Sequence, residues 1–336
     1  MTSNTENIYT PEGQSTIGGR IREAVTSLPG LERAMETGAI LEGNVLLCDA
    51  DFNLHIDFPA LPGVRGIIPR EETVYTRPGE SVKDIAILTR VGKTVCFKVT
   101  DLIYKEGTVT AMLSRRRAQA ECLHHYLSGL LPGDIIPARV THLENFGAFV
   151  DVGCGLPALL SVDAISVSRI AHPRDRLYNG QLIRVVVRHL DRSFGAHSGD
   201  PGRIFVSMRE LLGTWEENAA GFQAGQTVAG IVRSVEDYGV FVELAPNLAG
   251  LAELKDPQHE RDVVEAMVGR SAAVFIKSII PERMKIKLVL IDAFKGETPP
   301  TPRLTYYIPE NVTHMDHWLY SPPGARRRVE SIFPVE

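Results

Sequence analysis

The sequence predicts an all-β protein made of three tandem five-stranded barrels that short helices join. An aromatic strand motif occurs three times, as DFNLHIDF (51–58), NFGAFVDVG (145–153) and DYGVFVEL (237–244). Each copy lies within a series of five short strand-like segments separated by glycines, a pattern typical of small closed barrels. Apolar and charged contents of 44% and 23% are ordinary for a globular protein.

Each repeat shows the same order of elements. A strand opens the repeat after a glycine, the aromatic strand follows, a short third strand comes next, and a polar stretch precedes the last two strands. The expected segments are a partly disordered N-terminal segment (1–36), a first barrel (37–117), a linker helix (118–132), a second barrel (133–211), a second linker helix (212–223), a third barrel (224–292) and a tail rich in proline and aromatic residues (293–336). The tail shows no pattern that predicts a fold.

The linker between the first two barrels has a helical pattern. Ala118, Cys122 and Tyr126 recur at four-residue spacing, and the glycines Gly129 and Gly133 end the segment. The stretch ELLGTWEENAAGF carries a weaker helical pattern between the second and third barrels. The arginines at 115–117 precede the first linker and are either a solvated helix start or an RNA clamp.

The second aromatic motif places a large ring beside an acidic side chain. Read with a period of two residues, one face carries Ala148, Val150 and Val152, and the other carries Phe149 and Asp151. We expect the aspartate to face water, so the phenylalanine on the same face should also be exposed. The alternative is that the tail or a neighbouring repeat covers this ring.

The other two copies keep this layout. In the third, Phe241 and Glu243 are expected on the outer face. In the first, His55 takes the place of the outward phenylalanine and Asp57 that of the aspartate, while Asn53 replaces the bend glycine. Because asparagine tolerates positive φ better than most residues, we expect Asn53 to keep a positive φ there.

This architecture and its motifs resemble the S1 RNA-binding domain, an oligonucleotide-binding (OB) fold. The stretches that carry the resemblance are GIIPREE with LSRRRAQ, and FGAFVDVGCG with SVSRIAHPRDR. The chain as a whole resembles short bacterial members of the ribosomal protein S1 family. The resemblance implies three tandem S1-type OB barrels that bind RNA across the outer faces of their second and third strands.

The expected site combines stacking rings with neighbouring cations, since exposed rings stack on unpaired bases and cations hold the phosphates. The resemblance implies ring positions Phe146 and Phe149, Tyr238 and Phe241, and Phe52 and His55. Strand parity adds outward residues on the fourth and fifth strands of the second repeat, which are Arg184, Arg188, Phe205 and Arg209. Comparable outward places in the third repeat hold Arg233 and Lys277. Phe146 and Tyr238 have the alternative of being half-buried barrel caps.

The sequence contains no phosphate-cradling GxxxxGK[ST], no GxSxG and no HExxH motif, so we expect no enzyme activity and no cofactor. We also expect no metal site, because neither HMDHW in the tail nor the pair His124 and His125 has further ligands nearby. Four widely spaced cysteines suit a reducing cytoplasm. The polar start and the absence of a long apolar run predict neither a signal peptide nor a membrane partner.

The expected partners are single-stranded RNA, as mRNA, and the small ribosomal subunit, with no small-molecule substrate. By resemblance, the first repeat is expected to dock on the ribosome while the second binds message. Three rival functions stay open: a ribosome-independent RNA regulator, an accessory RNA-binding chain of a ribonuclease complex, and a protein-docking role for the barrels.

Overall fold

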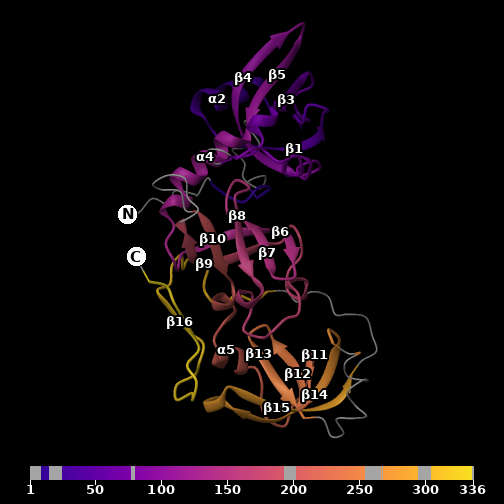
Figure 1. The fold of residues 1–336 in the computed structure, drawn as a ribbon, viewed down its shortest axis with the longest axis vertical. Helices are drawn as coiled ribbons and strands as arrows, with labels where there is room; N and C mark the ends of the chain where they lie inside the picture. The colour runs from indigo at the N-terminus through magenta and orange to yellow at the C-terminus, as the bar shows by residue number, and fades with distance from the viewer. Residues whose placement is uncertain are drawn as a thin grey trace.

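The structure is a computed structural model that describes residues 9–14, 25–76, 80–192, 202–253, 266, 268–293 and 304–334. Three closed five-stranded barrels follow one another along the long axis of the molecule, the first at the top of Figure 1 and the third at the bottom. The predicted all-β class of three tandem barrels is therefore confirmed. Much of the expected N-terminal segment lies outside the described residues.

Barrel 1 follows helix α2 (Leu28–Thr37), which the side chain of Ser27 caps. A short helix, α3 (Asp84–Leu88), lies between its third and fourth strands. The strands close in the order β1-β2-β3-β5-β4, and they are β1 (Leu41–Cys48), β2 (Leu54–Asp57), β3 (Val64–Ile68), β4 (Thr94–Lys105) and β5 (Thr108–Ser114). Leu54 and Ile56 of β2 are buried in its core, as a period of two residues requires.

Helix α4 (Arg115–His125) leads from barrel 1 to barrel 2 and begins slightly before the expected linker at 118. Barrel 2 closes in the order β10-β8-β7-β6-β9, and its strands are β6 (Ile135–Glu144), β7 (Gly147–Asp151), β8 (Pro157–Ser161), β9 (Leu182–Asp191) and β10 (Arg203–Ser207). The inward residues Ala148, Val150 and Val152 are completely buried, as strand parity predicts.

Helix α5 (Trp215–Ala219) joins barrels 2 and 3 and starts with a capping box between Thr214 and Glu217. Barrel 3 closes in the order β11-β12-β13-β15-β14, and its strands are β11 (Thr227–Glu236), β12 (Gly239–Ala245), β13 (Leu248–Ala252), β14 (Ser271–Ile280) and β15 (Lys285–Ala293). Single turns of 3₁₀ helix lie at Arg70–Glu72, Leu127–Gly129, Val162–Ala164, Pro173–Asp175, Arg209–Leu212 and Pro281–Arg283.

The bend glycines open the aromatic strands where a neighbouring strand leaves no room for a side chain. A Cβ atom at Gly147 would lie 2.4 Å from the carbonyl oxygen of Leu160, and one at Gly239 would lie 2.5 Å from that of Ala252. The close approach of two backbones thus explains why both repeats have glycine here.

The expectation that Asn53 keeps a positive φ in barrel 1 is wrong, because the residue in that conformation is Phe52, with φ of 64°. Asn53 is instead held by its amide group. Its Nδ2 donates to Asp49 at 3.1 Å, and its Oδ1 accepts from the backbone N–H of Arg70 at 3.1 Å. Asparagine at this place therefore ties two loops together by hydrogen bonds.

The C-terminal tail, whose fold the sequence did not predict, packs along barrels 2 and 3 (Figure 1). It forms a small hairpin of β16 (His317–Leu319) and β17 (Glu330–Ile332). Trp318 and Tyr320 are buried against the core of barrel 3, and Phe333 is buried against an apolar cluster of barrel 2. The tail therefore fastens these two barrels to each other.

Asp151 is buried, which contradicts the expectation that the acidic position faces water. Its carboxylate accepts the backbone N–H of Glu12 at 2.7 Å and those of Gly153 and Gly155 at 2.8 and 2.9 Å. Glu12 in turn receives two hydrogen bonds, of 2.6 and 3.0 Å, from Arg115 at the start of α4. The N-terminal peptide thus links the start of helix α4 to barrel 2. Arg115 is therefore neither a solvated helix start nor an RNA clamp.

This buried pair predicts a pH dependence of stability. Burial, and then the charge of Glu12, raise the pKa of Asp151 to about 7. Because the folded state binds this proton more tightly than the unfolded state, the stabilisation is present at low pH and is lost as pH rises from about 4 through 7. We expect the free energy of unfolding to fall by at least about 1.4 kcal/mol between pH 5 and 7.5, the equivalent of one pKa unit.

Urea titrations across this pH range measure the effect, and Asp151→Asn is the matched variant because it cannot titrate. Burial opposes the ionisation of Glu12, but the charge of Arg115 outweighs it and lowers the pKa of Glu12 below its usual value. Glu12 therefore does not change its charge between pH 5 and 7.5. An equal pH slope in the wild type and Asp151→Asn would contradict the assignment.

The equivalent acid of barrel 3 is buried in the same way. Glu243 accepts hydrogen bonds from Arg176 of barrel 2 at 2.5 Å and from Arg233 of its own barrel at 2.6 Å. Arg233 also lies 3.6 Å from Asp175. The expectation that Arg233 faces solvent is wrong, since only 7% of its side chain is exposed. Asp151 thus joins barrel 2 to the N-terminal peptide, and Glu243 joins barrel 3 to barrel 2.

Candidate nucleic-acid interface

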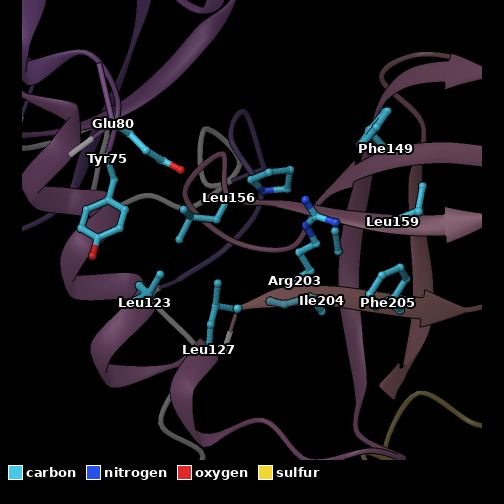
Figure 2. Close-up of a pocket in the computed structure, with 13 residues that line it drawn as sticks. Tyr75, Glu80, Leu123, Leu127, Phe149, Leu156, Leu159, Arg203, Ile204 and Phe205 are labelled. Carbon is cyan, nitrogen blue, oxygen red and sulfur yellow. The ribbon is translucent and has the colours of Figure 1, made fainter. Parts of the chain in front are cut away.

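A continuous row of side chains crosses the outer face of barrel 2. Phe149 of β7 pairs with Leu159 of β8, which pairs with Phe205 of β10, which pairs with His189 of β9. The first three are half-exposed and His189 is exposed. Figure 2 shows Phe149, Leu159 and Phe205 on neighbouring strands of one face. We call these four residues the barrel 2 row.

Phe146 extends this surface at the bend before β7. Its ring is 55% exposed and meets the ring of Phe149 edge to face, with centroids 6.0 Å apart at 88°. The alternative that Phe146 is a half-buried cap is therefore wrong. At the other end of the row, His189 stacks on Phe205 with centroids 6.0 Å apart at 30°. The surface offers several flat apolar groups to solvent.

A cation lies beside these rings. Arg188 is exposed at the bulge in β9, where Val187 and His189 pair with consecutive residues of β10. Its guanidinium lies 3.6 Å from the carboxylate of Asp163, and both side chains are well exposed. A shallow hollow of about 320 Å³ next to it is lined by Ser161, Arg188, His189, Phe205 and Val206. Arg188 can thus reach a phosphate near a base on Phe205.

Barrel 3 has an equivalent row with different chemistry. Phe241 of β12 pairs with Leu251 of β13, which pairs with Lys287 of β15, which pairs with Ser278 of β14. Tyr238 is 63% exposed and meets Phe241 edge to face at 6.2 Å and 89°, so it is not a buried cap either. This face has one aromatic pair where barrel 2 has two.

The cations of barrel 3 partly compensate for the missing rings. Lys277 is exposed, as predicted, and Lys287 is exposed within the row itself. Lys287 was not predicted from the sequence, although its alternation with the buried Ile286 and Leu288 is a usable signal. His189 of barrel 2 was also missed, because parity alone does not reveal the bulge that turns it toward Phe205.

The row of barrel 1 carries no phenylalanine. It consists of His55, Ile67, Met112 and Asp101 on β2, β3, β5 and β4. An aspartate on this face repels phosphate, and the row offers one imidazole to a base. Of the three barrels, barrel 1 is therefore the least suited to stack on bases and to attract the phosphates of an RNA backbone.

Both remaining ring candidates of barrel 1 are engaged within the protein. His55 Nε2 lies 2.9 Å from Asp49, and this hydrogen bond is the main reason that the pKa of Asp49 is lowered to about 2. The ring of Phe52 is half-exposed and is covered on one face by Arg70, whose guanidinium carbon lies 4.6 Å from the ring centroid.

Arg184 was expected to contact RNA, but the tail occupies its guanidinium group. It donates hydrogen bonds of 2.7, 2.9 and 3.2 Å to the backbone carbonyl oxygens of Ile308, Pro309 and Val312. It also lies over the ring of Tyr306, at 5.8 Å. The expectation that this arginine is available on an open strand face is wrong, because the tail covers that side of barrel 2.

Arg209 is likewise committed to an internal contact. Its Nε donates to Glu210 at 3.2 Å, and its Nη2 donates to Ser331 of the tail at 3.1 Å. Only 23% of its side chain is exposed. Of the three arginines predicted in barrel 2, Arg188 is thus the one that is exposed beside the row and not bound to the tail.

Three closed five-stranded barrels, of which barrels 2 and 3 carry phenylalanine rows on their outer faces, define a tandem-barrel protein of the OB type. Residues 131–196, which include most of barrel 2, match the family model of the S1 RNA binding domain, and the predicted resemblance is confirmed. Within the described ranges, no helix is long and apolar enough to cross a membrane, and no three potential metal ligands gather at one place.

Among curated proteins, the chain is similar to small ribosomal subunit protein bS1 of Staphylococcus aureus, with 29% identity over 67% of this chain and 56% of the relative. A bS1 homolog of Bacillus cereus is 28% identical over 69% of this chain and 59% of the relative. The chain thus spans little more than half the length of these relatives. A solved multidomain protein with nucleic acid binding domains from Streptococcus pneumoniae aligns over 76% of this chain and 73% of its own, with 14% identity and a TM-score of 0.23.

Proposed function

We propose that this chain binds single-stranded RNA on the outer faces of barrels 2 and 3 and helps a small ribosomal subunit hold mRNA in translation. The role is that of a cytoplasmic binding protein without catalysis of its own. The observation that carries the proposal is the barrel 2 row, in which Phe149, Phe205 and His189 present rings beside an exposed cation. Such rings stack on any unpaired base, each contributing about 1–3 kcal/mol.

The proposed contacts are distributed unequally. Barrel 2 supplies Phe146, Phe149, Phe205, His189 and Arg188, and barrel 3 supplies Tyr238, Phe241, Lys277 and Lys287. Barrel 1, with Asp101 in its row, serves to dock the chain on a protein partner. Similarity to bS1 proteins supports the small subunit as that partner.

Salt and strandedness test the RNA part of the proposal. If Arg188, Lys277 and Lys287 each neutralise one phosphate, a plot of log affinity against log salt should have a slope of about −2. Duplex RNA should compete poorly, because its bases are not free to stack. Fluorescence anisotropy with a labelled oligonucleotide measures both quantities.

The variant Arg188→Ala should make this slope shallower by about 0.7, the share of one phosphate contact on a single strand. Lys105→Ala, at the exposed tip of the β4–β5 hairpin of barrel 1, is the matched control and should leave the slope unchanged. Equal competition by duplex and single strand would contradict the proposal.

Sedimentation of a lysate through a sucrose gradient tests the ribosomal part. We expect the protein in the small-subunit fractions at low salt and its release at high salt. Sedimentation only with small ribonucleoproteins would favour a ribosome-independent regulator, and sedimentation with a ribonuclease would favour an accessory role.

A further inference from the structure

A pocket of about 560 Å³ lies between barrel 2 and the segment that joins it to barrel 1, which consists of helix α4 and the 3₁₀ turn Leu127–Gly129 and is called the connector below. The pocket opens beside the barrel 2 row (Figure 2). This volume falls within the range of about 300–1,000 Å³ that is usual for small-ligand sites. Leu123 and Leu127 of the connector form one wall, Tyr75 of barrel 1 closes one end, and Phe149 and Phe205 stand at the other. Barrel 2 alone does not make this pocket, because the first wall and Tyr75 come from outside the barrel.

The chemistry of the lining suits a flat uncharged group. Of the residues that line the pocket, only Glu80 and Arg203 carry charge, and the rest are apolar, aromatic or glycine. A phosphate would have to enter beside a carboxylate and give up its hydration against leucine side chains, which is costly. A nucleobase loses little hydration on its two faces and gains contact with Tyr75 and the leucines.

The pocket and the open face also share residues. Phe149, Leu159 and Phe205 belong both to the barrel 2 row and to the pocket lining. A strand that stacks one base on Phe205 therefore carries its next base to the mouth of the pocket. Arg203, which Figure 2 shows between the pocket and the row, stands where the intervening backbone would pass.

We propose that this pocket receives one unpaired nucleobase of the same RNA strand that stacks on Phe149 and Phe205. The inference rests on the proposed function and adds a second, enclosed kind of base contact to it. It makes the connector helix and Tyr75 part of the binding site, so that the covalent and packed arrangement of barrels 1 and 2 contributes directly to affinity.

Acrylamide quenching of 2-aminopurine tests this directly in the full chain. Single-stranded heptamers carry the fluorescent base at each position in turn. We expect one position to be protected from acrylamide several-fold more than its neighbours, because an enclosed base is shielded on both faces whereas a base on the open row is shielded on one. Uniform quenching at all positions would overturn the inference.

Two variants change the pocket without touching the two phenylalanines. Leu156→Trp fills it, and Tyr75→Ala removes its aromatic end; each should lower affinity roughly 5-fold or more, the share of one stacked base. Tyr178→Ala is the matched control, because this exposed tyrosine of the same barrel does not line the pocket. Thermal unfolding establishes that each variant is folded.

The outcomes separate the inference from the function on which it rests. Wild-type affinity in both pocket variants, together with weak binding by a variant of the open row, would overturn the pocket and keep the RNA function. Failure of the wild-type chain to bind any single-stranded heptamer would overturn both.

Discussion

Replacing Phe149 and Phe205 together by alanine is expected to weaken single-stranded RNA binding about 30-fold or more. The two rings lie on either side of Leu159 in one row and are half-exposed. Each lost stack removes about 1–3 kcal/mol, and about 1.4 kcal/mol corresponds to a factor of ten in affinity. Anisotropy with a labelled oligonucleotide at constant salt measures the change.

The matched control is the pair of equivalent positions in barrel 1, changed as His55→Ala with Met112→Ala. These residues hold the same places in the row, yet they offer no phenyl ring and stand with Asp101. We expect less than a three-fold loss, about 0.6 kcal/mol. Intact affinity in a folded Phe149 and Phe205 variant would show that RNA binds elsewhere, and a large loss in the control would give barrel 1 a share of the site.

The substitution Glu243→Gln is expected to cost about 3–5 kcal/mol of stability, the largest effect on the fold that we predict. Its carboxylate is the shared acceptor for Arg176, which is completely buried, and for Arg233, which is nearly so. Burial already lowers the pKa of Arg176. Removing the negative charge leaves the buried guanidinium of Arg176 without its carboxylate partner and leaves Arg233 with Asp175 alone, at 3.6 Å, at the junction of barrels 2 and 3.

Chemical denaturation monitored by circular dichroism measures this loss, and we expect barrel 3 to unfold in a separate, earlier transition. Asp57→Asn is the matched control, since Asp57 is the equivalent acid of barrel 1 and is half-exposed. It should change stability by no more than about 0.5 kcal/mol. Equal effects of the two substitutions would mean that Glu243 is not an anchor between barrels.

The sequence by itself determined the three barrels and the rings on their outer faces. Glycines at the turns and apolar residues at every second position are local signals. The alternation within one strand therefore predicts which of its residues face the barrel core and which face outward. Phe149, Phe205 and Phe241 were therefore assigned to the outer face from the sequence, whereas Phe146 and Tyr238 were expected as ring positions from the resemblance to the S1 domain. Their contact with RNA is a prediction that the variants above address.

The set of residues that are neighbours on the outer face depends on the register between strands. The alternation of residues within one strand does not reveal this register. The bulge at Arg188 brings His189 opposite Phe205, and the pairing of β13 with β15 brings Lys287 beside Leu251. Neither neighbour is close in sequence. The row therefore becomes visible only when the strands are paired.

Only the tertiary structure decided which outward charges reach water. Strand parity placed Asp151, Glu243 and Arg184 outside their barrels, and they do lie outside the barrel cores. Parity cannot show what packs against that outer face, because the covering groups come from distant segments: Glu12 for Asp151, Arg176 for Glu243 and the C-terminal tail for Arg184. A buried polar or charged side chain requires a hydrogen-bonding partner whatever its distance along the chain, so the contacts of these three side chains join segments that are far apart in the sequence.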